Sequence, residues 1–296
     1  MAQILSGKEL AAAIKQQVKE AIQEEGLTPG LGIVFKGDLG DDTPAARYVR
    51  NKVKDCAEVG IHTRVVALDK NDDRYVDYIE DMNGDPRIHG IIVQLPLPNH
   101  LGTRRIINTI LPEKDVDGLT QANIGRLWEG KPLFKPCTPA AVMRLLEYYG
   151  YELDGTTWGN MNVVILGRSD IVGKPLAAMM LQQNATVSIC HSHTLSATMS
   201  AMLENADIIV SAVGSSNVQG NFYTVNSIDM DDFNQQVIFI DVGISTGEDG
   251  KLYGDIDPDC YTHSNCEAYT PVPGGIGPMT RAMLLENVLQ AARLQK

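Results

Sequence analysis

The chain has 296 residues, of which 44% are hydrophobic and 21% charged, a composition typical of a globular protein long enough for two domains. Its formal net charge of −12 disfavours a nucleic-acid or anionic-membrane surface, so an anionic ligand must be held by locally placed cations and N–H groups. The five cysteines are odd in number and form no C-x-x-C pair, which fits a reducing compartment and disfavours a disulfide framework or a zinc site.

The first part of the chain alternates helical and extended patterns. Apolar residues at four-residue spacing predict a helix that ends near Gly26. Three apolar runs predict buried strands, at 31–35, 64–68 and 90–95. Helices are expected at 45–59 and 74–82, followed by a short helix near Arg105 and a charged loop at 111–118. This alternation predicts a parallel sheet.

The second part repeats the alternation. A helix is expected over 138–149, and four strands are expected at 163–166, 185–190, 207–212 and 237–241. We therefore expect an α/β protein of two αβα domains with a cleft between them. The first domain is predicted over 1–138 and is completed by a C-terminal helical segment at 270–296. The second, of Rossmann type, is predicted over 139–269.

Residues 162–175 organise the second domain. The segment Asn-Val-Val-Ile-Leu-Gly-Arg-Ser-Asp-Ile-Val-Gly-Lys-Pro predicts a strand, a glycine turn at Gly167 and a helix that opens at Gly173. Free N–H groups and the helix dipole at such a turn favour an anion. The glycine spacing is not the three-glycine dinucleotide fingerprint, so the stretch alone fits an ordinary strand–loop–helix joint equally well.

The end of the next strand bears on the choice of cofactor. An NAD-binding unit carries an acid there for the ribose hydroxyls, whereas this chain has Cys-His-Ser-His-Thr at 190–194. Ser192 together with Arg168 can bind a 2′-phosphate, which favours NADP over NAD. Alternatively, Ser192 or Thr194 caps the helix that begins near Leu195, and the two roles are compatible.

The first domain carries the candidate catalytic side chains. Tyr48 and Lys52 are four residues apart and share one helix face, so the lysine is a candidate proton carrier, although a solvated lysine beside a surface tyrosine has the same spacing. Gln94 ends the third strand, where it lines a cleft or caps the loop. Asp117 can accept hydrogen bonds from an amidine-like ligand edge, or it can form an Asx-turn before Gly118.

These motifs together resemble the bifunctional methylenetetrahydrofolate dehydrogenase/methenyltetrahydrofolate cyclohydrolase family, the bacterial FolD type. The resemblance covers nearly the whole chain, in blocks of the right order. The matching blocks are 48–52, 90–98, 112–118 with Asn123 and Gly125, 136–139, 167–175, 184–187, 190–192, 206–210, 241–244, 254–255 and 271–280.

The resemblance implies oxidation of 5,10-methylenetetrahydrofolate with NADP, followed by hydrolysis to 10-formyltetrahydrofolate, in one-carbon metabolism. It implies catalytic roles for Lys52, Tyr48, Gln94 and Asp117. The implied substrate-binding residues are these four with Leu95, Pro271, Gly274 and Gly275. The implied cofactor-binding residues are Gly167, Arg168, Ser169, Ile171, Val172, Gly173, His191, Ser192, Ala212, Val213, Gly214, Asp241, Gly243 and Ile244. No metal is implied.

The chain departs from the family pattern at several positions. The departures are Ala45 for a usual serine, Leu119-Thr120 for Phe-His, Ala141 for glycine and Ser216 for proline. The first two flank the implied folate site, so they bear on relative rates and on substrate affinity. They leave Lys52, Tyr48 and Gln94 in place.

Alternative functions stay open at this point. A dehydrogenase without efficient cyclohydrolase activity keeps the fold, and a non-catalytic nucleotide-binding module keeps only the second domain's role. A shikimate- or amino-acid-type dehydrogenase shares the two-domain plan but leaves Tyr48, Lys52, Gln94 and Asp117 unexplained. No apolar run reaches the length of a membrane span and the first residues lack a signal pattern, so we expect a cytoplasmic protein. The expected partners are a folate, with or without a polyglutamate tail, and a second copy of the chain.

Overall fold

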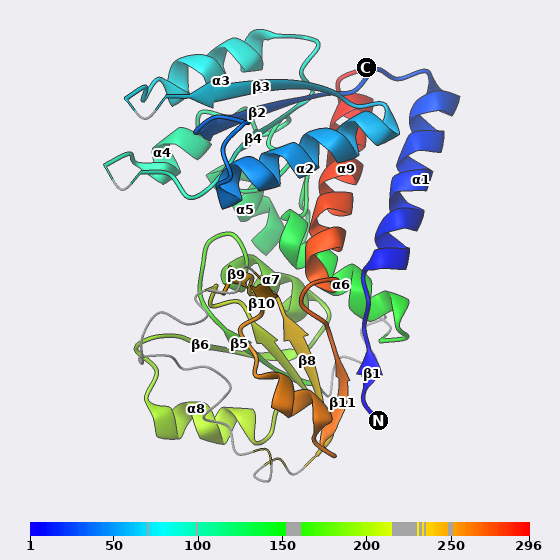
Figure 1. Cartoon of the computed structure of the whole chain (residues 1–296), viewed down its shortest axis with the longest axis vertical. Coiled ribbons are helices and arrows are strands. Elements are labelled where there is room, and N and C mark those ends of the chain that lie inside the picture. Colours follow the sequence, from blue (N-terminus) through cyan, green and yellow to red (C-terminus); the bar gives the residue numbers. More distant parts are fainter. Residues whose placement is uncertain are drawn as a thin grey trace. The chain divides into compact units, whose positions relative to one another are not determined.

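The computed structural model describes residues 1–69, 71–98, 100–151, 161–214, 230, 233, 235–247 and 251–296. The chain forms two compact units, each built on its own parallel sheet (Figure 1). Unit 1 contains Met1–Ala11 and Thr138–Thr280, and unit 2 contains Ala12–Cys137 and Arg281–Lys296. The expected α/β class is confirmed.

Unit 2 is built on a three-stranded sheet of order β3-β2-β4, all parallel. The strands are β2 (Gly30–Lys36), β3 (His62–Leu68) and β4 (Gly90–Val93). In Figure 1 this sheet is seen nearly edge-on, with α2 and α3 on opposite sides. The helices that contribute to the unit are α1 (Lys8–Glu25), α2 (Pro44–Val59), α3 (Tyr75–Gly84), α4 (Thr103–Ile107), α5 (Gln121–Trp128) and α9 (Ile276–Leu294).

The start of α2 follows from local chemistry. Thr43 has extended backbone geometry, and its hydroxyl accepts a hydrogen bond from the Ala46 N–H at 3.2 Å. Pro44 occupies the first turn, where its missing N–H costs no hydrogen bond. The helix ends at Gly60, whose φ of 88° is left-handed. Both ends of the helix that carries Tyr48 and Lys52 are thus defined by their own residues.

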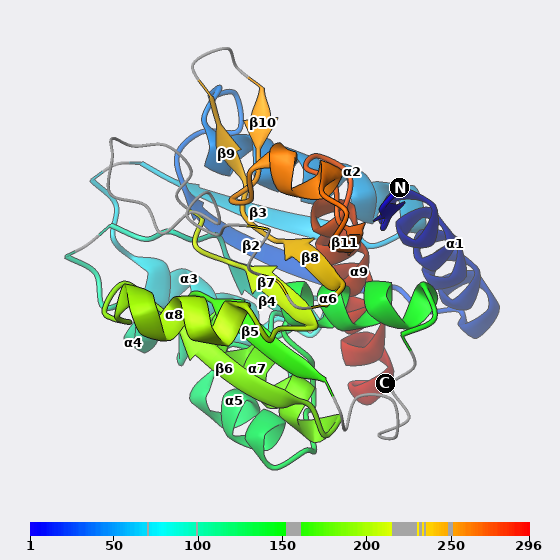
Figure 2. The same ribbon diagram turned by 90° about the horizontal axis from the view of Figure 1, so that it is seen from below.

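Unit 1 is built on a six-stranded sheet of order β1-β11-β8-β7-β5-β6, in which every pairing is parallel. Figure 2 shows β8, β7, β5 and β6 running side by side. The strands are β1 (Gln3–Ile4), β5 (Asn162–Leu166), β6 (Thr186–Cys190), β7 (Ile208–Ser211), β8 (Val237–Asp241) and β11 (Cys266–Tyr269). The other elements are α6 (Cys137–Tyr148), α7 (Gly173–Gln182), α8 (Ser196–Leu203), the short pair β9 (Ser245–Thr246) and β10 (Leu252–Tyr253), and the 3-10 helix η4 (Pro258–Thr262).

The strand order creates a switch point beside β5. The chain passes from β5 through α7 to β6 on one side, and then returns to β7 on the other side. In open parallel sheets, ligands bind where the connections diverge in this way, beyond the carboxyl ends of the strands. The turn at Gly167 and the loop at 212–214 lie at those ends of β5 and β7. The fold therefore places two of the expected cofactor segments side by side.

The division of the chain differs from the expected boundaries at the N-terminus. Residues 1–11 and 270–280 belong to unit 1 and not to the unit that contains 12–137. The cause is β1, which pairs in parallel with β11 through Gln3 with Ala268 and Ile4 with Tyr269. The backbone N–H of Leu5 extends this pairing by donating to the Tyr269 carbonyl at 2.8 Å.

Several short elements were not expected from the sequence. These are β1, β9, β10, β11, η4 and α5. The expected strand at 90–95 ends at Val93, so that Gln94 lies just beyond it. Among the described residues, no helix is long and apolar enough to cross a membrane.

Candidate active site

The structure brings Lys52 and Gln94 into direct contact. Lys52 Nζ, on α2, donates to Gln94 Oε1 at 3.1 Å. Gln94 is held in turn, because its backbone N–H donates to the Val34 carbonyl at 2.9 Å and its Nε2 donates to the Leu95 carbonyl at 2.9 Å. The amide therefore presents its oxygen to the amine, and the position of the Lys52 amine is fixed by the carboxyl end of the sheet.

The Tyr48 ring lies one helical turn before Lys52. It is 40% exposed, so part of the ring remains accessible to a ligand. Desolvation of the remainder raises the pKa of the Tyr48 hydroxyl, with the Arg47 charge opposing that shift, so the phenol stays neutral at physiological pH. The ring therefore offers an aromatic surface without a charge.

The loop around Asp117 is shaped by a different carboxylate, that of Asp115. Asp115 is 1% exposed and accepts from Leu119 N at 3.1 Å, from Thr120 N at 2.8 Å and from Asn123 Nδ2 at 2.8 Å. Burial raises the pKa of Asp115, and these hydrogen bonds oppose the shift. The Asx-turn alternative for Asp117 is therefore not realised, because Asp115 fixes the turn and leaves the half-buried Asp117 carboxylate for other contacts.

Cys137, at the start of α6, interacts with Asp117. Desolvation raises the pKa of its thiol well above the usual value, and the charge and hydrogen bond of Asp117 raise it further. The Lys52 charge opposes this shift. The thiol donates to the Val116 carbonyl at 3.5 Å, and Asn287 Nδ2 lies 3.7 Å from the sulfur. Cys137 is therefore a neutral, buried group that contacts the candidate site.

Sequence reasoning assigned no role to Cys137, Asn287 or Asp115. Asn287 comes from α9 and donates to the Val116 carbonyl at 2.8 Å and to the Lys135 carbonyl at 2.9 Å. It is 171 positions from Val116 in the chain, so no local pattern signals the contact. Polar residues inside otherwise apolar helix faces are the only sequence signal that could have indicated such a role.

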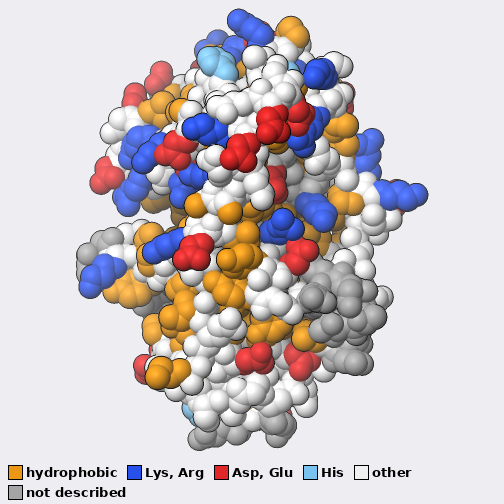
Figure 3. All heavy atoms as spheres, turned by 90° about the vertical axis from the view of Figure 1, so that its right-hand side faces the viewer, with side chains coloured by type: hydrophobic (Ala, Val, Ile, Leu, Met, Phe, Trp, Pro, Cys, Tyr) orange, Lys and Arg blue, Asp and Glu red, His pale blue; other side chains and the backbone are white. Residues whose placement is uncertain are grey.

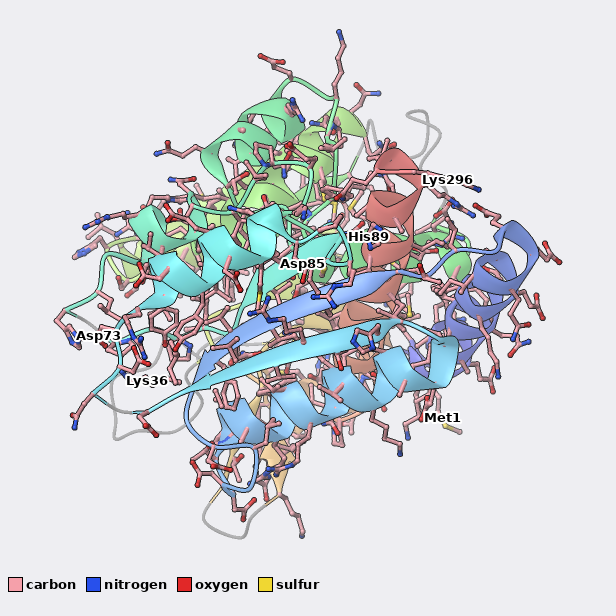
Figure 4. The ribbon with its side chains drawn as sticks, turned by 90° about the horizontal axis from the view of Figure 1, so that it is seen from above. Met1, Lys36, Asp73, Asp85, His89 and Lys296 are labelled. Carbon is pink, nitrogen blue, oxygen red and sulfur yellow. The ribbon has the colours of Figure 1, made fainter. Side chains whose placement is uncertain are left out.

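A second group of polar residues lies at the same sheet end of unit 2. Figure 4 shows Lys36 and Asp73 close together, and Lys36 Nζ donates to Asp73 Oδ1 at 2.9 Å. His100 Nε2 lies 2.9 Å from the other carboxylate oxygen of Asp73. Within the described residues, these three side chains therefore pair with one another.

The glycine turn after β5 has the tight geometry that a dinucleotide requires. Gly167 has a φ of 117°, and a Cβ there would lie 2.5 Å from the Ala212 carbonyl oxygen. The start of α7 differs from the expectation of free N–H groups, because the Ser169 hydroxyl accepts from Val172 N at 3.1 Å and from Gly173 N at 3.4 Å. The helix dipole remains directed at the turn.

Arg168 and Ser192 are the two residues expected to hold a 2′-phosphate. Both are exposed, and neither has a hydrogen-bond partner within the part of the chain that the structure describes. The capping alternative for Ser192 and Thr194 is wrong: Leu195 is the N-cap of α8 and supplies no side-chain hydrogen bond. The Thr194 hydroxyl instead accepts from His191 N at 2.9 Å, which closes the turn after β6.

The side chain of Asp241 is buried and hydrogen-bonded within the protein. It is 1% exposed and accepts hydrogen bonds from Gly243 N, Asp255 N and Ile256 N, all within the loops around it. Desolvation raises its pKa to about 6 despite these bonds. By contrast, Ala212, Val213, Gly214 and Ile244 are at least partly exposed beside it, while Gly243 is buried.

The loop at 271–275 is anchored within unit 1. Gly275 N donates to the Pro271 carbonyl at 2.7 Å, and Gly7 N donates to the Gly274 carbonyl at 2.9 Å. The φ of Gly274 is 116°, which favours glycine at this position. The segment that precedes α1 therefore supports the loop expected to line the folate site.

The departures from the family pattern have local explanations in part. Thr120 caps α5, because its hydroxyl accepts from Asn123 N at 3.3 Å. Thr43 caps α2, so Ala45 does not disturb the helix start. Ala141 is fully buried in α6. Ser216 lies outside the described residues.

The residues present fit a dinucleotide with a 2′-phosphate. The glycine turn admits a close backbone approach, and the Arg168 guanidinium and Ser192 hydroxyl, which have no hydrogen-bond partner among the described residues, follow β5 and β6. Within the described ranges, no group of three or more His, Cys, Asp or Glu side chains is placed to hold a metal ion. Fold and site together define a class of two-unit α/β proteins that carry a dinucleotide site and a lysine–glutamine site.

Comparison with known proteins identifies the family. Residues 5–117 match the catalytic domain, and residues 136–296 the NAD(P)-binding domain, of tetrahydrofolate dehydrogenase/cyclohydrolase. The chain belongs to this family. It is 41% identical to the bifunctional protein FolD of Streptococcus thermophilus, over 99% of this chain and 98% of that protein.

Solved structures give the same result. The bifunctional FolD enzyme from Campylobacter jejuni is 38% identical and superimposes with a TM-score of 0.87 over 100% of both chains. The methylenetetrahydrofolate dehydrogenase-cyclohydrolase from Trypanosoma brucei, determined with NADP cofactor and an inhibitor, is 32% identical with a TM-score of 0.84, over 99% of this chain and 98% of that one.

Proposed function

We infer that the chain oxidises 5,10-methylenetetrahydrofolate to 5,10-methenyltetrahydrofolate with NADP+, and then hydrolyses that product to 10-formyltetrahydrofolate. The observation that carries this function is the Lys52–Gln94 contact, with Tyr48 and Asp117, in a chain that also has the glycine turn at Gly167. The family relationship supports both activities.

In the first reaction the bound NADP+ supplies the hydride acceptor, which takes two electrons and a hydrogen nucleus from the methylene carbon. The folate nitrogens stabilise the cation that remains, so the protein needs no strong acid or base for this step. Its residues bind and align the reactants. Arg168 and Ser192 hold the 2′-phosphate, and the Gly167 turn lets the backbone approach the pyrophosphate.

In the second reaction water adds to the methenyl carbon of the cation, and the C–N bond to one ring nitrogen breaks. The balance is one water consumed and one proton released. A group must accept the water proton and another proton must reach the departing nitrogen, and the Lys52 amine performs both transfers. Gln94 holds that amine through its Oε1.

The other two residues recognise the substrate. The exposed part of the Tyr48 ring stacks on the aminobenzoate ring, an aromatic contact that adds about 1 kcal/mol. Asp117 pairs with the pterin amidine through charge-assisted hydrogen bonds. Leu95, Pro271, Gly274 and Gly275 supply further substrate contacts.

Replacement of Lys52 by methionine tests this assignment. The substitution keeps the length of the side chain and removes the amine, so hydrolysis of methenyltetrahydrofolate is expected to fall by about 100-fold or more, the usual contribution of general acid–base catalysis. Lys54→Met is the matched control, since Lys54 lies on the same helix with 76% of its side chain exposed. Wild-type hydrolysis by the Lys52 variant would show that another group moves the proton.

We further propose that the protein is a cytoplasmic homodimer that takes folates with or without a polyglutamate tail. Neither nucleic acid nor membrane is an expected partner. The charge of −12 supports this, as do the acidic and basic side chains that intermingle on the face shown in Figure 3. Light scattering on the purified protein tests the dimer: a monomer mass at micromolar concentration contradicts it.

A further inference from the structure

Two buried carboxylates lie beneath the loops that follow β7 and β8. Asp255 comes after β10 and is 6% exposed. Its Oδ2 accepts three hydrogen bonds, from Ser211 Oγ at 3.1 Å, from Val213 N at 2.8 Å and from Gly214 N at 3.2 Å. One carboxylate oxygen thus fixes the backbone of the loop at 212–214 where it leaves the sheet.

Asp241 connects Asp255 to the second loop. Its Oδ1 accepts from Gly243 N and from Asp255 N, both at 3.0 Å. Its Oδ2 accepts from Ile256 N at 2.9 Å and from Tyr261 OH at 3.3 Å. The chain of contacts runs from the loop after β8, through Asp241, to Asp255 and on to the loop after β7.

The glycines around the pair show how closely the backbone follows the two carboxylates. A Cβ at Gly243 would lie 2.0 Å from the Asp255 carboxyl group, and a Cβ at Gly254 would lie 2.0 Å from Asp241 Oδ2. Each carboxylate therefore lies against a glycine that neighbours the other in sequence. Any movement of one carboxylate must be transmitted to the backbone of both loops.

We propose that Asp255 is a positioning residue for the dinucleotide, setting the backbone of Val213 and Gly214 directly and that of Gly243 through Asp241. The proposal rests on the proposed function and on the family resemblance, which implies that Val213, Gly214 and Gly243 contact the cofactor. Asp255 itself does not touch the ligand, since its side chain is buried and its Oδ2 is occupied by protein donors. It is absent from the cofactor-binding residues that the sequence indicated.

The arrangement is more specific than general support of the fold. The residues that Asp255 holds are themselves exposed, with Val213 42% exposed, whereas their N–H groups point inward to the carboxylate. Hydrogen bonds to an ionised group are roughly twice as strong as neutral ones, so an exposed loop can be kept in one conformation by a single buried oxygen. A loop fixed before binding loses less conformational freedom when the ligand arrives.

The test compares Asp255→Asn, Ser211→Ala and the control Asp259→Asn. Asparagine keeps the size of the side chain but loses the charge. In one of its two orientations, its amide NH2 group faces the protein donors that Asp255 accepts from, and it cannot accept from them. Asp259 is exposed and four residues away, and its carboxylate has no hydrogen-bond partner among the described residues. The same change there is therefore a matched control. Ser211→Ala removes one donor and leaves the two backbone donors in place.

The readouts are the Kd and KM for NADP+, measured beside the hydrolysis of methenyltetrahydrofolate without any dinucleotide. For Asp255→Asn we expect both constants to rise about tenfold relative to the control. The rate of oxidation at limiting NADP+, divided by the rate of hydrolysis, should fall by the same factor. Ser211→Ala should give a smaller rise, of about threefold. A crystal structure of Asp255→Asn should show a displaced backbone at 213–214.

Two results overturn the proposal. If both variants keep the wild-type Kd and KM while only their melting temperatures fall, Asp255 stabilises the fold and does not position the ligand. If wild-type protein neither binds nor reduces NADP+, the proposed function fails first and the role of Asp255 fails with it. Because the wild-type protein is measured in the same experiment, the two failures are distinguishable.

Discussion

The candidate site residues of the two units differ in how their charged groups are used. In unit 2, Lys52 and Asp117 are only partly buried, and their polar groups remain available to a ligand. In unit 1, Asp241 and Asp255 are buried and spend their oxygens on backbone N–H groups of the protein itself. Unit 2 thus has partly exposed polar side chains at its candidate site, whereas unit 1 has buried carboxylates that hold its loops and an exposed arginine, Arg168.

This contrast predicts that the most damaging single change in unit 1 is a backbone change. Gly167→Ala places a Cβ 2.5 Å from the Ala212 carbonyl at a φ of 117°, so the turn must rearrange. Such strain costs about 1–3 kcal/mol, and NADP+ affinity is expected to fall by about 100-fold. Hydrolysis of methenyltetrahydrofolate without dinucleotide provides the internal reference.

The control for that change is Gly125→Ala, since Gly125 lies within α5 and a Cβ there meets no atom within 4 Å. It should leave NADP+ affinity unchanged and slightly stabilise the helix, by about 0.5–1 kcal/mol. If Gly167→Ala binds NADP+ with the affinity of the wild type, the turn does not contact the dinucleotide.

A side-chain change in unit 1 should have a smaller effect and should alter specificity. Ser192→Asp introduces a carboxylate at the site where Ser192 and Arg168 are expected to hold the 2′-phosphate. There it repels that phosphate and can accept hydrogen bonds from ribose hydroxyls. The ratio of kcat/KM for NADP+ to that for NAD+ is expected to fall at least about tenfold. The preference is measured with both cofactors under one set of conditions, and an unchanged ratio contradicts the Ser192 contact.

The last effect is on stability and not on ligand binding, and it concerns the buried carboxyl group of Asp241. Because the pKa of Asp241 is raised from 3.8 to about 6 in the folded protein, the folded state keeps this proton over a pH range in which the unfolded state has lost it. The contribution of Asp241 to the free energy of unfolding therefore falls as pH rises from about 4 to about 7, by up to about 3 kcal/mol.

The measurement for this effect is denaturant unfolding of the wild type and of Asp241→Asn across that pH range. The difference between the two free energies of unfolding should change in favour of the variant as pH rises, because asparagine does not titrate. A difference independent of pH would show that Asp241 is ionised in the folded protein throughout this range.

The same contrast explains what the sequence could and could not predict. Apolar runs such as 163–166 and 237–241 predicted their strands closely, because a buried parallel strand is apolar along its whole length. The two-residue strand β1 gave no such pattern, so the sequence did not predict that residues 1–11 group with unit 1. Local periodicity does not report a pairing between residues 3 and 268.

The candidate site residues also differ in how well the sequence predicted them. Lys52 and Gln94 were identified from motif resemblance and spacing, and the structure brings them into contact. The resemblance implied that Asp241 binds the cofactor, and the structure shows its carboxylate buried against backbone N–H groups of the neighbouring loops. Asp255 and Asn287 were missed because their partners are distant in the chain, which only the folded structure reveals.

A single assay of the wild-type protein tests the proposed bifunctional activity. Purified protein is mixed with 5,10-methylenetetrahydrofolate and NADP+, and NADPH, methenyl-folate and 10-formyl-folate are followed together. We expect NADPH to form in step with the folate products, with the methenyl compound rising and then decaying to the formyl compound, and with that decay lost in Lys52→Met. Binding of NADP+ without any formation of NADPH would contradict the proposed dehydrogenase activity.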